Sequence, residues 1–322
     1  MSKKLFSLLA LLIVASVALA ACAPAGSNAG AGVTACQVTD VGGIDDKTFN
    51  ATAYKGVTDA EAQLGVDGSY LESQEQADYE TNINAFVEQG CDLIITVGFL
   101  LGDATYAAAD ANPDQNFTIV DYGSNFDGAT RSNLVGLNFA TDQAAFLAGY
   151  MAAANTQTGK VGTFGGLNIP PVTAFMNGFW YGVQYYNEQN GTAVEVLGWD
   201  PAAPDSGLFT GNFESTDDGR AMGETLMDEG ADIIMPVAGP VGLGTAAAVQ
   251  ERGNAWIIGV DTDMSVSAPE YADIILTSVL KNMDVAVFTQ IEAVVNGTFA
   301  GGTDYLGTLE NGGVGIAGTF DG

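Results

Sequence analysis

The 322-residue sequence contains no histidine, only nine lysines and arginines, and three cysteines. Without histidine, a Ser-His-Asp triad is impossible and the commonest zinc ligand is absent. Nine basic residues against 39 acidic ones argue against nucleic-acid binding, which needs clustered lysine and arginine to displace counterions. The negative field also disfavours phosphorylated ligands. We therefore expect no metal, no cofactor and no nucleic-acid partner.

The N-terminus has the pattern of an export signal. Lys3 and Lys4 precede an apolar stretch, residues 5–20, that is too short for a stable membrane span but suits a signal peptide. Residues 19–22, Leu-Ala-Ala-Cys, have the form of a bacterial lipobox, although an ordinary signal peptide with an incidental cysteine is the alternative. We predict a signal peptide over residues 1–21, lipidation of Cys22, and a flexible tether over residues 22–32.

The other two cysteines, Cys36 and Cys91, form an even number in an oxidising compartment. Cys36 lies early in a predicted strand, and Cys91 immediately precedes another apolar strand. Such strands can be neighbours in a doubly wound sheet. A disulfide between them is our hypothesis, with two buried free thiols as the alternative.

Apolar strands alternate with helical patterns along the remaining chain, which predicts α/β structure with parallel sheets. About 300 mature residues correspond to two domains at roughly 150 residues each. An internal echo supports that number, because residues 88–95 resemble residues 228–235, and Val120-Asp121 recurs 140 positions later as Val260-Asp261. The alternative is chance similarity between ordinary α/β units, which leaves the fold class unchanged.

Three charged residues are candidates for a cleft between the halves. Asp121 and Asp261 end equivalent strands and should face the crevice from opposite sides. Lys281 lies in an apolar context and, if buried, needs a carboxylate partner, which we expect to be Asp261. The alternative is a buried ion pair with only a structural role. Phe49 and either Phe179 or Trp180 could provide flat walls for a ring, although core packing is the commoner fate of an aromatic residue.

Residues 40–50, Asp-Val-Gly-Gly-Ile-Asp-Asp-Lys-Thr-Phe-Asn, follow a predicted strand at residues 33–41 and precede a predicted helix at residues 48–64. Such a turn presents backbone amides and side chains to a ligand. Asp45 or Asp46 can instead be an ordinary helix N-cap. That alternative does not account for Phe49 and Asn50.

Together with this turn, five further stretches resemble the basic membrane protein family of extracytoplasmic solute-binding lipoproteins, whose best-understood members are purine-nucleoside receptors of ABC importers. These stretches are residues 146–153, 176–187, 236–244, 259–263 and 276–288. The resemblance implies the type I periplasmic-binding-protein fold, with two Rossmann-like lobes joined by a hinge. We expect an N-terminal lobe over residues 33–138, completed by residues 283–322, and a C-terminal lobe over residues 139–282. The chain should cross between lobes near residues 135–142, near residues 262–270 and after residue 281, and the tail from Gly301 should wrap the first lobe.

The resemblance also implies how a nucleoside is held. Two aromatic residues sandwich the base, an aspartate contacts the base edge, and an aspartate and a lysine hold the ribose hydroxyls, with further contacts from the first turn and from a backbone glycine. Phe49 and Phe179 match the two aromatic residues, and Asp121 matches the aspartate at the base edge. Asp261 and Lys281 match the pair that holds the ribose. Asp45 and Asn50 match the first turn, and Gly239 matches the backbone glycine. Trp180, directly after Phe179, and Pro240, directly after Gly239, depart from the family pattern at the wall and at the loop.

We accordingly expect a monomeric receptor, not an enzyme, that is held at the extracytoplasmic face of the membrane by its lipid, binds nucleosides, and passes them to an ABC permease. One alternative is the same fold binding a sugar or another small polar ligand, or signalling to a partner. The other is a nucleoside or glycoside hydrolase using Asp45 with Asp46 or Asp261 with Asp263, whose close spacing resembles a capped turn more than two opposed carboxylates.

Overall fold

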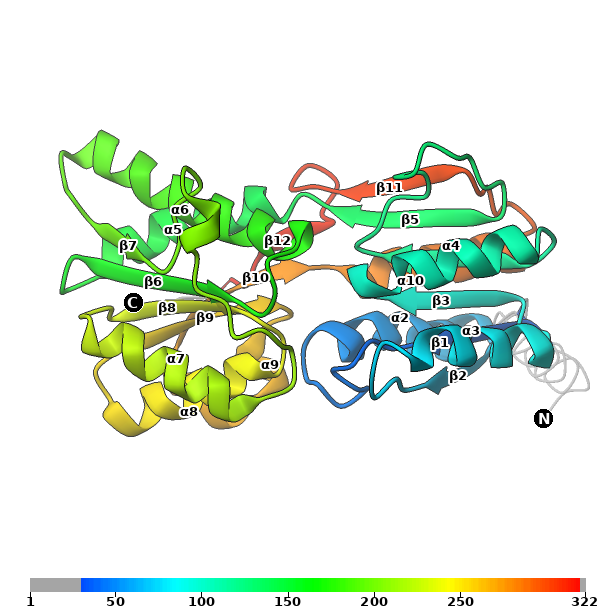
Figure 1. Cartoon of the computed structure of the whole chain (residues 1–322), viewed down its shortest axis with the longest axis horizontal. Coiled ribbons are helices and arrows are strands. Elements are labelled where there is room, and N and C mark those ends of the chain that lie inside the picture. The colour runs from blue at the N-terminus through cyan, green and yellow to red at the C-terminus, as the bar shows by residue number, and fades with distance from the viewer. Residues whose placement is uncertain (1–29, 319–322) are drawn as a thin grey trace, which may run out of the picture.

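The computed structural model describes residues 30–318 as two α/β lobes lying side by side along the long axis of the molecule (Figure 1). The predicted signal peptide, Cys22 and most of the predicted tether lie outside the described residues. Gly30 to Gly32 form a turn in which the Gly30 N–H donates to the Leu64 carbonyl (2.9 Å), so the end of the predicted tether packs on the first lobe. No helix among residues 30–318 is long and apolar enough to cross a membrane.

The first lobe is a six-stranded sheet in the order β11-β5-β4-β3-β1-β2, in which every pair is parallel. Helices α2 and α10 cover one face, and α3 and α4 cover the other. The strands are β1 (Thr34–Val38), β2 (Asp67–Leu71), β3 (Leu93–Val97), β4 (Asn116–Val120), β5 (Leu134–Phe139) and β11 (Thr303–Gly307). The helices are α2 (Phe49–Leu64), α3 (Asp78–Gln89), the 3-10 turn η1 (Phe99–Leu101), α4 (Gly102–Ala111) and α10 (Met283–Val295).

The second lobe repeats this plan in the order β12-β10-β9-β8-β6-β7, with only β12 antiparallel. Helices α5 and α6 pack on one face, and α7 and α8 on the other. The strands are β6 (Lys160–Gly165), β7 (Glu195–Leu197), β8 (Ile233–Val237), β9 (Trp256–Asp261), β10 (Ile275–Lys281) and β12 (Val314–Ile316). The helical segments are α5 (Thr141–Asn155), α6 (Pro170–Asn190), η2 (Pro204–Ser206), α7 (Thr216–Asp228), α8 (Val241–Arg252), α9 (Met264–Ser267) and η3 (Pro269–Ile274).

The chain passes between the lobes from β5 to α5, from β10 to α10 and from β11 to β12. The expected crossing near residues 262–270 is wrong, because α9 and η3 connect β9 to its parallel neighbour β10 within one sheet. The third crossing is instead made by the tail, which therefore does not stay on the first lobe. The three-residue strand β12 lies in a glycine-rich segment and gives no periodic signal in the sequence.

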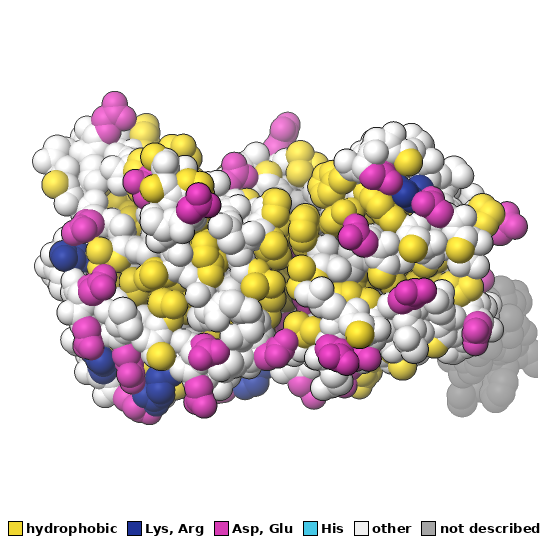
Figure 2. All heavy atoms as spheres, viewed as in Figure 1, with side chains coloured by type: hydrophobic (Ala, Val, Ile, Leu, Met, Phe, Trp, Pro, Cys, Tyr) yellow, Lys and Arg dark blue, Asp and Glu magenta, His cyan; other side chains and the backbone are white. Residues whose placement is uncertain are grey.

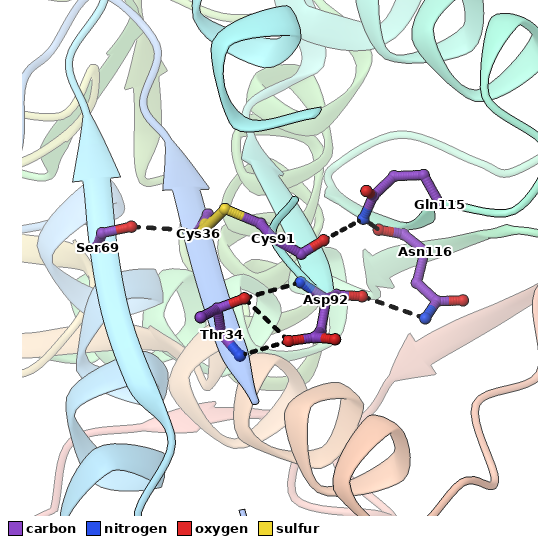
Figure 3. Close-up of a disulfide and its surroundings, with 7 residues drawn as sticks. All are labelled: Thr34, Cys36, Ser69, Cys91, Asp92, Gln115 and Asn116. Atoms are coloured by element: carbon purple, nitrogen blue, oxygen red, sulfur yellow. Dashed lines mark hydrogen bonds between the residues drawn. A yellow bond between two sulfur atoms is a disulfide. The ribbon is translucent and has the colours of Figure 1, made fainter. Parts of the chain in front are cut away.

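The amino ends of the first-lobe strands are held by structural contacts (Figure 3). Cys36 on β1 and Cys91, just before β3, form a disulfide. Beside it, the Asp92 carboxylate accepts hydrogen bonds from the Thr34 N–H (2.8 Å) and hydroxyl (2.9 Å). Gln115 Nε2 also donates to the Cys91 carbonyl (2.7 Å). These bonds fix the amino ends of the strands. The carboxyl ends, which face the other lobe, are left for a ligand.

Acidic side chains are spread over both lobes, with few basic ones between them (Figure 2). No group of three or more potential metal-ligating side chains occurs among the residues that the structure describes.

Candidate functional site

A cleft with about 600 Å³ of free space, including its open mouth, lies between the lobes. Both lobes line it with segments that follow the carboxyl ends of their strands, as expected for parallel sheets. Five charged side chains reach the cleft: Asp40, Asp46, Asp121, Asp261 and Lys281. Four aromatic rings join them: Phe49, Phe99, Phe175 and Phe213.

Asp121 and Asp261 occupy equivalent places at the ends of β4 and β9. Asp261 is buried and the Asp121 side chain is 8% exposed; both residues line the cleft in left-handed backbone conformations, with φ of 69° and 67° respectively. This conformation is uncommon for a residue with a side chain, and aspartate is among the few that tolerate it. The two halves of the chain therefore bring the same strained residue to the cleft from opposite sides.

Lys281, the last residue of β10, is 2% exposed and forms an ion pair with Asp121 of the first lobe. The expected partner, Asp261, was therefore wrong. β10 ends where the chain passes into the first lobe, so the Lys281 side chain reaches the carboxylate across the cleft. The Lys281 ammonium also lies 4.8 Å from the ring centroid of Phe49 and 5.9 Å from that of Phe175. One cation thus contacts groups from both lobes.

The Asp261 carboxylate has no such ion-pair partner among the described residues. Within residues 30–318, no lysine or arginine lies at ion-pair distance from it. Burial raises the pKa of Asp261 to about 7, although attraction to Lys281 opposes the rise and the nearby Asp121 adds to it. The second lobe therefore presents a buried acceptor that gains stability from any hydrogen-bond donor entering the cleft.

Asp40 is a cleft residue that the sequence analysis missed. Its carboxylate accepts hydrogen bonds from Asn50 Nδ2 (2.7 Å) and the Gly42 N–H (3.1 Å), and burial raises its pKa to about 6. The predicted strand ran to Val41 and enclosed Asp40, whereas β1 ends at Val38. Asp40 could have been found with the rule already applied to Asp121 and Asp261: an acidic residue at the carboxyl end of a strand faces the cleft.

The other acids of the first turn have different places. Asp45 is exposed and does not line the cleft. Asp46 is buried at the edge of the cleft and accepts hydrogen bonds from the N–H groups of Thr48 (3.0 Å), Asn50 (2.8 Å) and Ala51 (3.0 Å). Burial raises its pKa despite these bonds. Asp46 therefore caps the start of α2, and Asn50 lies behind the cleft wall, where it orients Asp40.

The aromatic residues that line the cleft from the second lobe are Phe175 and Phe213, not Phe179. Phe179 is fully buried in the lobe core, and its carbonyl contacts α5 so closely that a Cβ on Gly149 would lie 2.0 Å away. Trp180 packs edge-on against Tyr181 and does not line the cleft either. Phe175 lies one helical turn closer to the amino end of α6, which opens on the cleft. Gly239, with φ of 55°, lines the cleft as expected.

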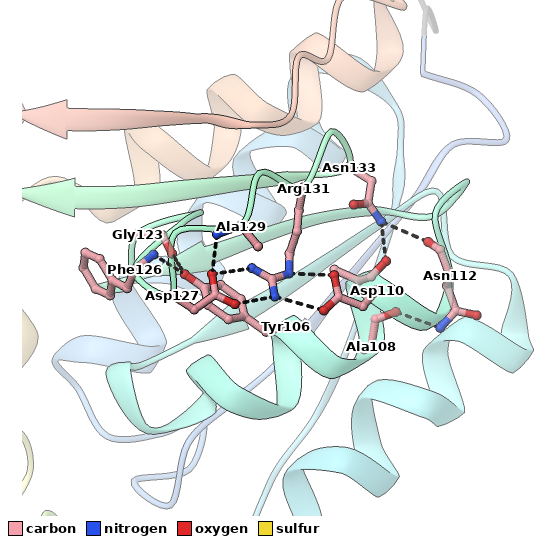
Figure 4. Close-up of polar contacts among 11 residues, drawn as sticks. Tyr106, Ala108, Asp110, Asn112, Gly123, Phe126, Asp127, Ala129, Arg131 and Asn133 are labelled. Atoms are coloured by element: carbon pink, nitrogen blue, oxygen red, sulfur yellow. Dashed lines mark hydrogen bonds and ion pairs between the residues drawn. The ribbon is translucent and has the colours of Figure 1, made fainter.

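A brace supports the loop that follows Asp121 (Figure 4). The Arg131 guanidinium binds the carboxylates of Asp110 and Asp127 and stacks 3.7 Å from the ring centroid of Tyr106. Hydrogen bonding from Arg131 lowers the pKa of Asp127 to about 2. Tyr106 in turn donates to the Gly123 carbonyl (2.5 Å) and accepts from the Phe126 N–H (2.8 Å). The loop therefore has a fixed conformation that helps hold Asp121 in place.

Comparison with known proteins gives consistent matches. The family model described as ABC transporter substrate-binding protein PnrA-like matches residues 33–321. A protein of Pyrococcus furiosus named as an uncharacterized lipoprotein is 34% identical, over 96% of this chain and 75% of its own length. The ABC transporter nucleoside-binding protein BmpA of Lactococcus lactis is 28% identical, over 98% of this chain and 91% of its own.

Solved structures agree with this assignment. An ABC transporter solute-binding protein from Aeropyrum pernix superposes with a TM-score of 0.79 at 32% identity, covering 89% of this chain and 76% of that one. A solute-binding protein from Conexibacter woesei, at 22% identity and a TM-score of 0.68, covers 89% and 88% and shares the fold. These matches confirm the predicted fold class, two lobes of the type I periplasmic-binding-protein kind.

Proposed function

Because this chain belongs to the family of PnrA-like ABC transporter substrate-binding proteins, we propose that it captures nucleosides, purine nucleosides above all, and delivers them to a membrane permease. One observation carries the ligand assignment. Buried carboxylates from opposite lobes, Asp121 and Asp261, flank a buried Lys281 beside aromatic rings. A nucleoside offers what this arrangement requires: hydroxyl and N–H donors around a flat ring.

The ribose belongs with the second-lobe groups. The Asp261 carboxylate accepts hydrogen bonds from the vicinal hydroxyls, and the Lys281 ammonium donates to one of their oxygens. Each hydrogen bond to a charged group contributes ~1.5 to 3 kcal/mol. Gly239, at the same wall, lets the backbone approach the sugar because it has no side chain.

The base belongs between Phe49 and Phe175, one ring from each lobe. Stacking on an aromatic side chain contributes ~1 to 3 kcal/mol per base in nucleic-acid sites. Asp40 and Asp121 then accept hydrogen bonds from the N–H groups on the base edge. With four acids and one lysine at the cleft, a phosphate group would meet net repulsion, so nucleotides are poor ligands.

Hydrolysis fits the geometry less well than binding. Asp46 and Asp263, one from each acid pair considered for catalysis, are engaged at helix starts: Asp46 caps α2, and Asp263 accepts hydrogen bonds from the Ser265 N–H (3.0 Å) and hydroxyl (2.6 Å). Asp45 lies outside the cleft. Neither pair therefore supplies two free opposed carboxylates.

Lipid attachment at Cys22, an extracytoplasmic location and a monomeric state during transport complete the proposal. The lipobox-like residues 19–22 support the first two, as does the name lipoprotein that relatives carry.

The test is calorimetry of the protein expressed from the full sequence, unfolded and refolded beforehand to remove any co-purified ligand. Nucleosides, free bases, nucleotides and sugars are titrated in turn. We expect micromolar or tighter nucleoside affinity, about 8 kcal/mol or more, and at least tenfold weaker binding of the matching nucleotide. Binding of sugars alone would refute the ligand assignment while leaving the family unchanged. Release of free base from a nucleoside would show a hydrolase instead.

A further inference from the structure

All seven basic residues among residues 30–318 form ion pairs with acidic side chains. Five of them bind acids of their own lobe. The other two bind acids of the opposite lobe: Lys281 pairs with Asp121, and Lys47 pairs with Glu270. The Lys281 pair belongs to the cleft already described, whereas neither Lys47 nor Glu270 lines that cleft. The Lys47–Glu270 pair therefore connects the lobes without belonging to the ligand site.

The Lys47–Glu270 pair joins two segments that are each fixed to their own lobe. Lys47 Nζ lies 2.8 Å from Glu270 Oε1. Lys47 directly follows Asp46, whose carboxylate accepts hydrogen bonds from three backbone N–H groups within residues 48–51. In the second lobe, the Glu270 carbonyl accepts a hydrogen bond from Gln250 Nε2 (2.6 Å), which ties η3 to α8. Because both backbones are held, forming the pair costs less conformational entropy than pairing two flexible loops would.

The backbone of Lys47 is also unusual. Its φ is 60°, in the left-handed region that a lysine rarely adopts. Such a conformation persists only where the surrounding structure imposes it. The next residue, Thr48, approaches the second lobe, since a Cβ on Gly239 would lie 3.7 Å from Thr48 Oγ1. The turn therefore holds the lysine toward the second lobe and touches that lobe at two points.

The pair lies away from two of the chain crossings between the lobes. In Figure 1 the loop before α2 faces α9 on the lower side of the molecule, whereas the chain passes from β5 to α5 and from β11 to β12 on the upper side. A hydrogen bond from the Ala140 N–H to the Gly307 carbonyl (2.8 Å) links these two crossings. Hinge motion rotates one lobe about such crossings, so groups on the far side move most. Opening of the cleft would therefore separate Lys47 from Glu270.

Electrostatic repulsion gives the pair a role in closure. Acidic side chains predominate on both lobes (Figure 2), and three acids of the first lobe lie close enough to Asp261 to raise its pKa. This repulsion opposes closure. Lys281 offsets part of it inside the cleft, and the Lys47–Glu270 pair adds attraction outside it. The hydrogen bond from Lys47 lowers the pKa of Glu270, so the pair stays ionised at neutral pH.

We propose that the Lys47–Glu270 pair is a latch that holds the lobes together beside the cleft and slows the escape of a bound ligand. The pair exists only while the lobes are together, because each lobe provides one member. Its side chains are 43% and 48% exposed, so it stabilises the closed form modestly and the cleft can still open. The effect of the latch on ligand release rests on the proposed receptor function, whereas its effect on closure does not.

Double electron–electron resonance tests the latch in the ligand-free protein expressed from the full sequence, with spin labels at positions 62 and 266. Both positions are exposed, on α2 and α9, and a ketone amino acid introduced there leaves the native cysteines untouched. Lys47→Gln and Glu270→Gln should each lower the ratio of closed to open protein about two- to fivefold, as for other exposed ion pairs. The double variant should lower it no further, because both substitutions remove the same contact. Lys55→Gln is the matched control: it breaks exposed pairs within the first lobe and should change nothing.

An unchanged distance distribution in both single variants, additive effects in the double variant, or an equal shift in Lys55→Gln would refute the latch. Stopped-flow release of adenosine or guanosine gives a second readout. The dissociation rate constant should rise by the same factor in Lys47→Gln and Glu270→Gln, and not in Lys55→Gln. Equal rates in variants whose cleft opens would also overturn the latch. If the wild type binds neither nucleoside, the proposed function fails instead, and the interlobe distances still decide whether the latch exists.

Discussion

In each lobe an equivalent strand ends at an aspartate with a left-handed backbone, Asp121 in the first lobe and Asp261 in the second. The surroundings of the two aspartates differ. Asp121 is paired with Lys281, whereas Asp261 is buried without an ion pair among the described residues. The difference arises because one lysine, at a crossing between lobes, faces two carboxylates and can pair closely with only one. We infer that Asp121 stabilises the ligand-free protein through Lys281 and keeps its second carboxylate oxygen for the base edge, whereas Asp261 offers the ligand a carboxylate with no ion pair to compete.

Asp121→Asn gives the largest effect that we expect. Asparagine tolerates the left-handed backbone, so the substitution removes only the charge and leaves Lys281 buried without its partner. The free energy of unfolding of the ligand-free protein should fall by about 3 to 5 kcal/mol, measured by urea denaturation. Unchanged stability would mean that Asp261 takes over the pairing, and the contrast between the two aspartates would then disappear.

Asp261→Asn is the matched substitution on the other lobe. It removes a buried carboxylate that lacks an ion pair, so the free energy of unfolding should not fall at neutral pH. The nucleoside should lose ~1.5 to 3 kcal/mol of binding free energy, a 10- to 150-fold weaker affinity by calorimetry. A loss of stability as large as that of Asp121→Asn would contradict the assigned roles.

A second pair of variants tests whether the second lobe provides a wall for the base. Phe175→Leu should weaken nucleoside binding by ~1 to 3 kcal/mol because it removes the stacking face. Phe179→Leu alters the core instead, so it should lower the melting temperature and leave the affinity of the folded protein nearly unchanged. The reverse outcome would restore Phe179 as the wall and displace Phe175.

The last comparison of the two aspartates concerns pH. The pKa of Asp261 rises from 3.8 to about 7 on folding, so the folded protein binds more protons than the unfolded chain in this interval. Asp261 therefore stabilises the ligand-free protein below pH 3.8, and this contribution is lost as the pH rises through about 7. Comparing wild type with Asp261→Asn by urea denaturation from pH 4 to pH 8 isolates this group. The wild type should lose stability relative to the variant as pH rises; parallel curves would refute the shift.

The sequence determined much of the architecture through local patterns. Alternating apolar strands and helices indicated α/β structure. The similarity between segments 140 positions apart placed Asp121 and Asp261 at equivalent strand ends. The six stretches from the turn at residues 40–50 onward indicated the family. All these signals depend on neighbours in the chain, on backbone propensity or on motif order, so they can be read without knowing what packs against them.

Only the tertiary structure decided which groups meet. Lys281 pairs with Asp121 because β10 ends at the crossing, where the lysine side chain reaches the other lobe. Phe175 lines the cleft and Phe179 does not, because one helical turn of α6 separates the cleft from the lobe core. The end of β1 at Val38, which exposed Asp40 to the cleft, depends on pairing with β2 and β3. Such contacts are set by the distances between elements remote in the chain, and a linear pattern of residue types does not contain those distances.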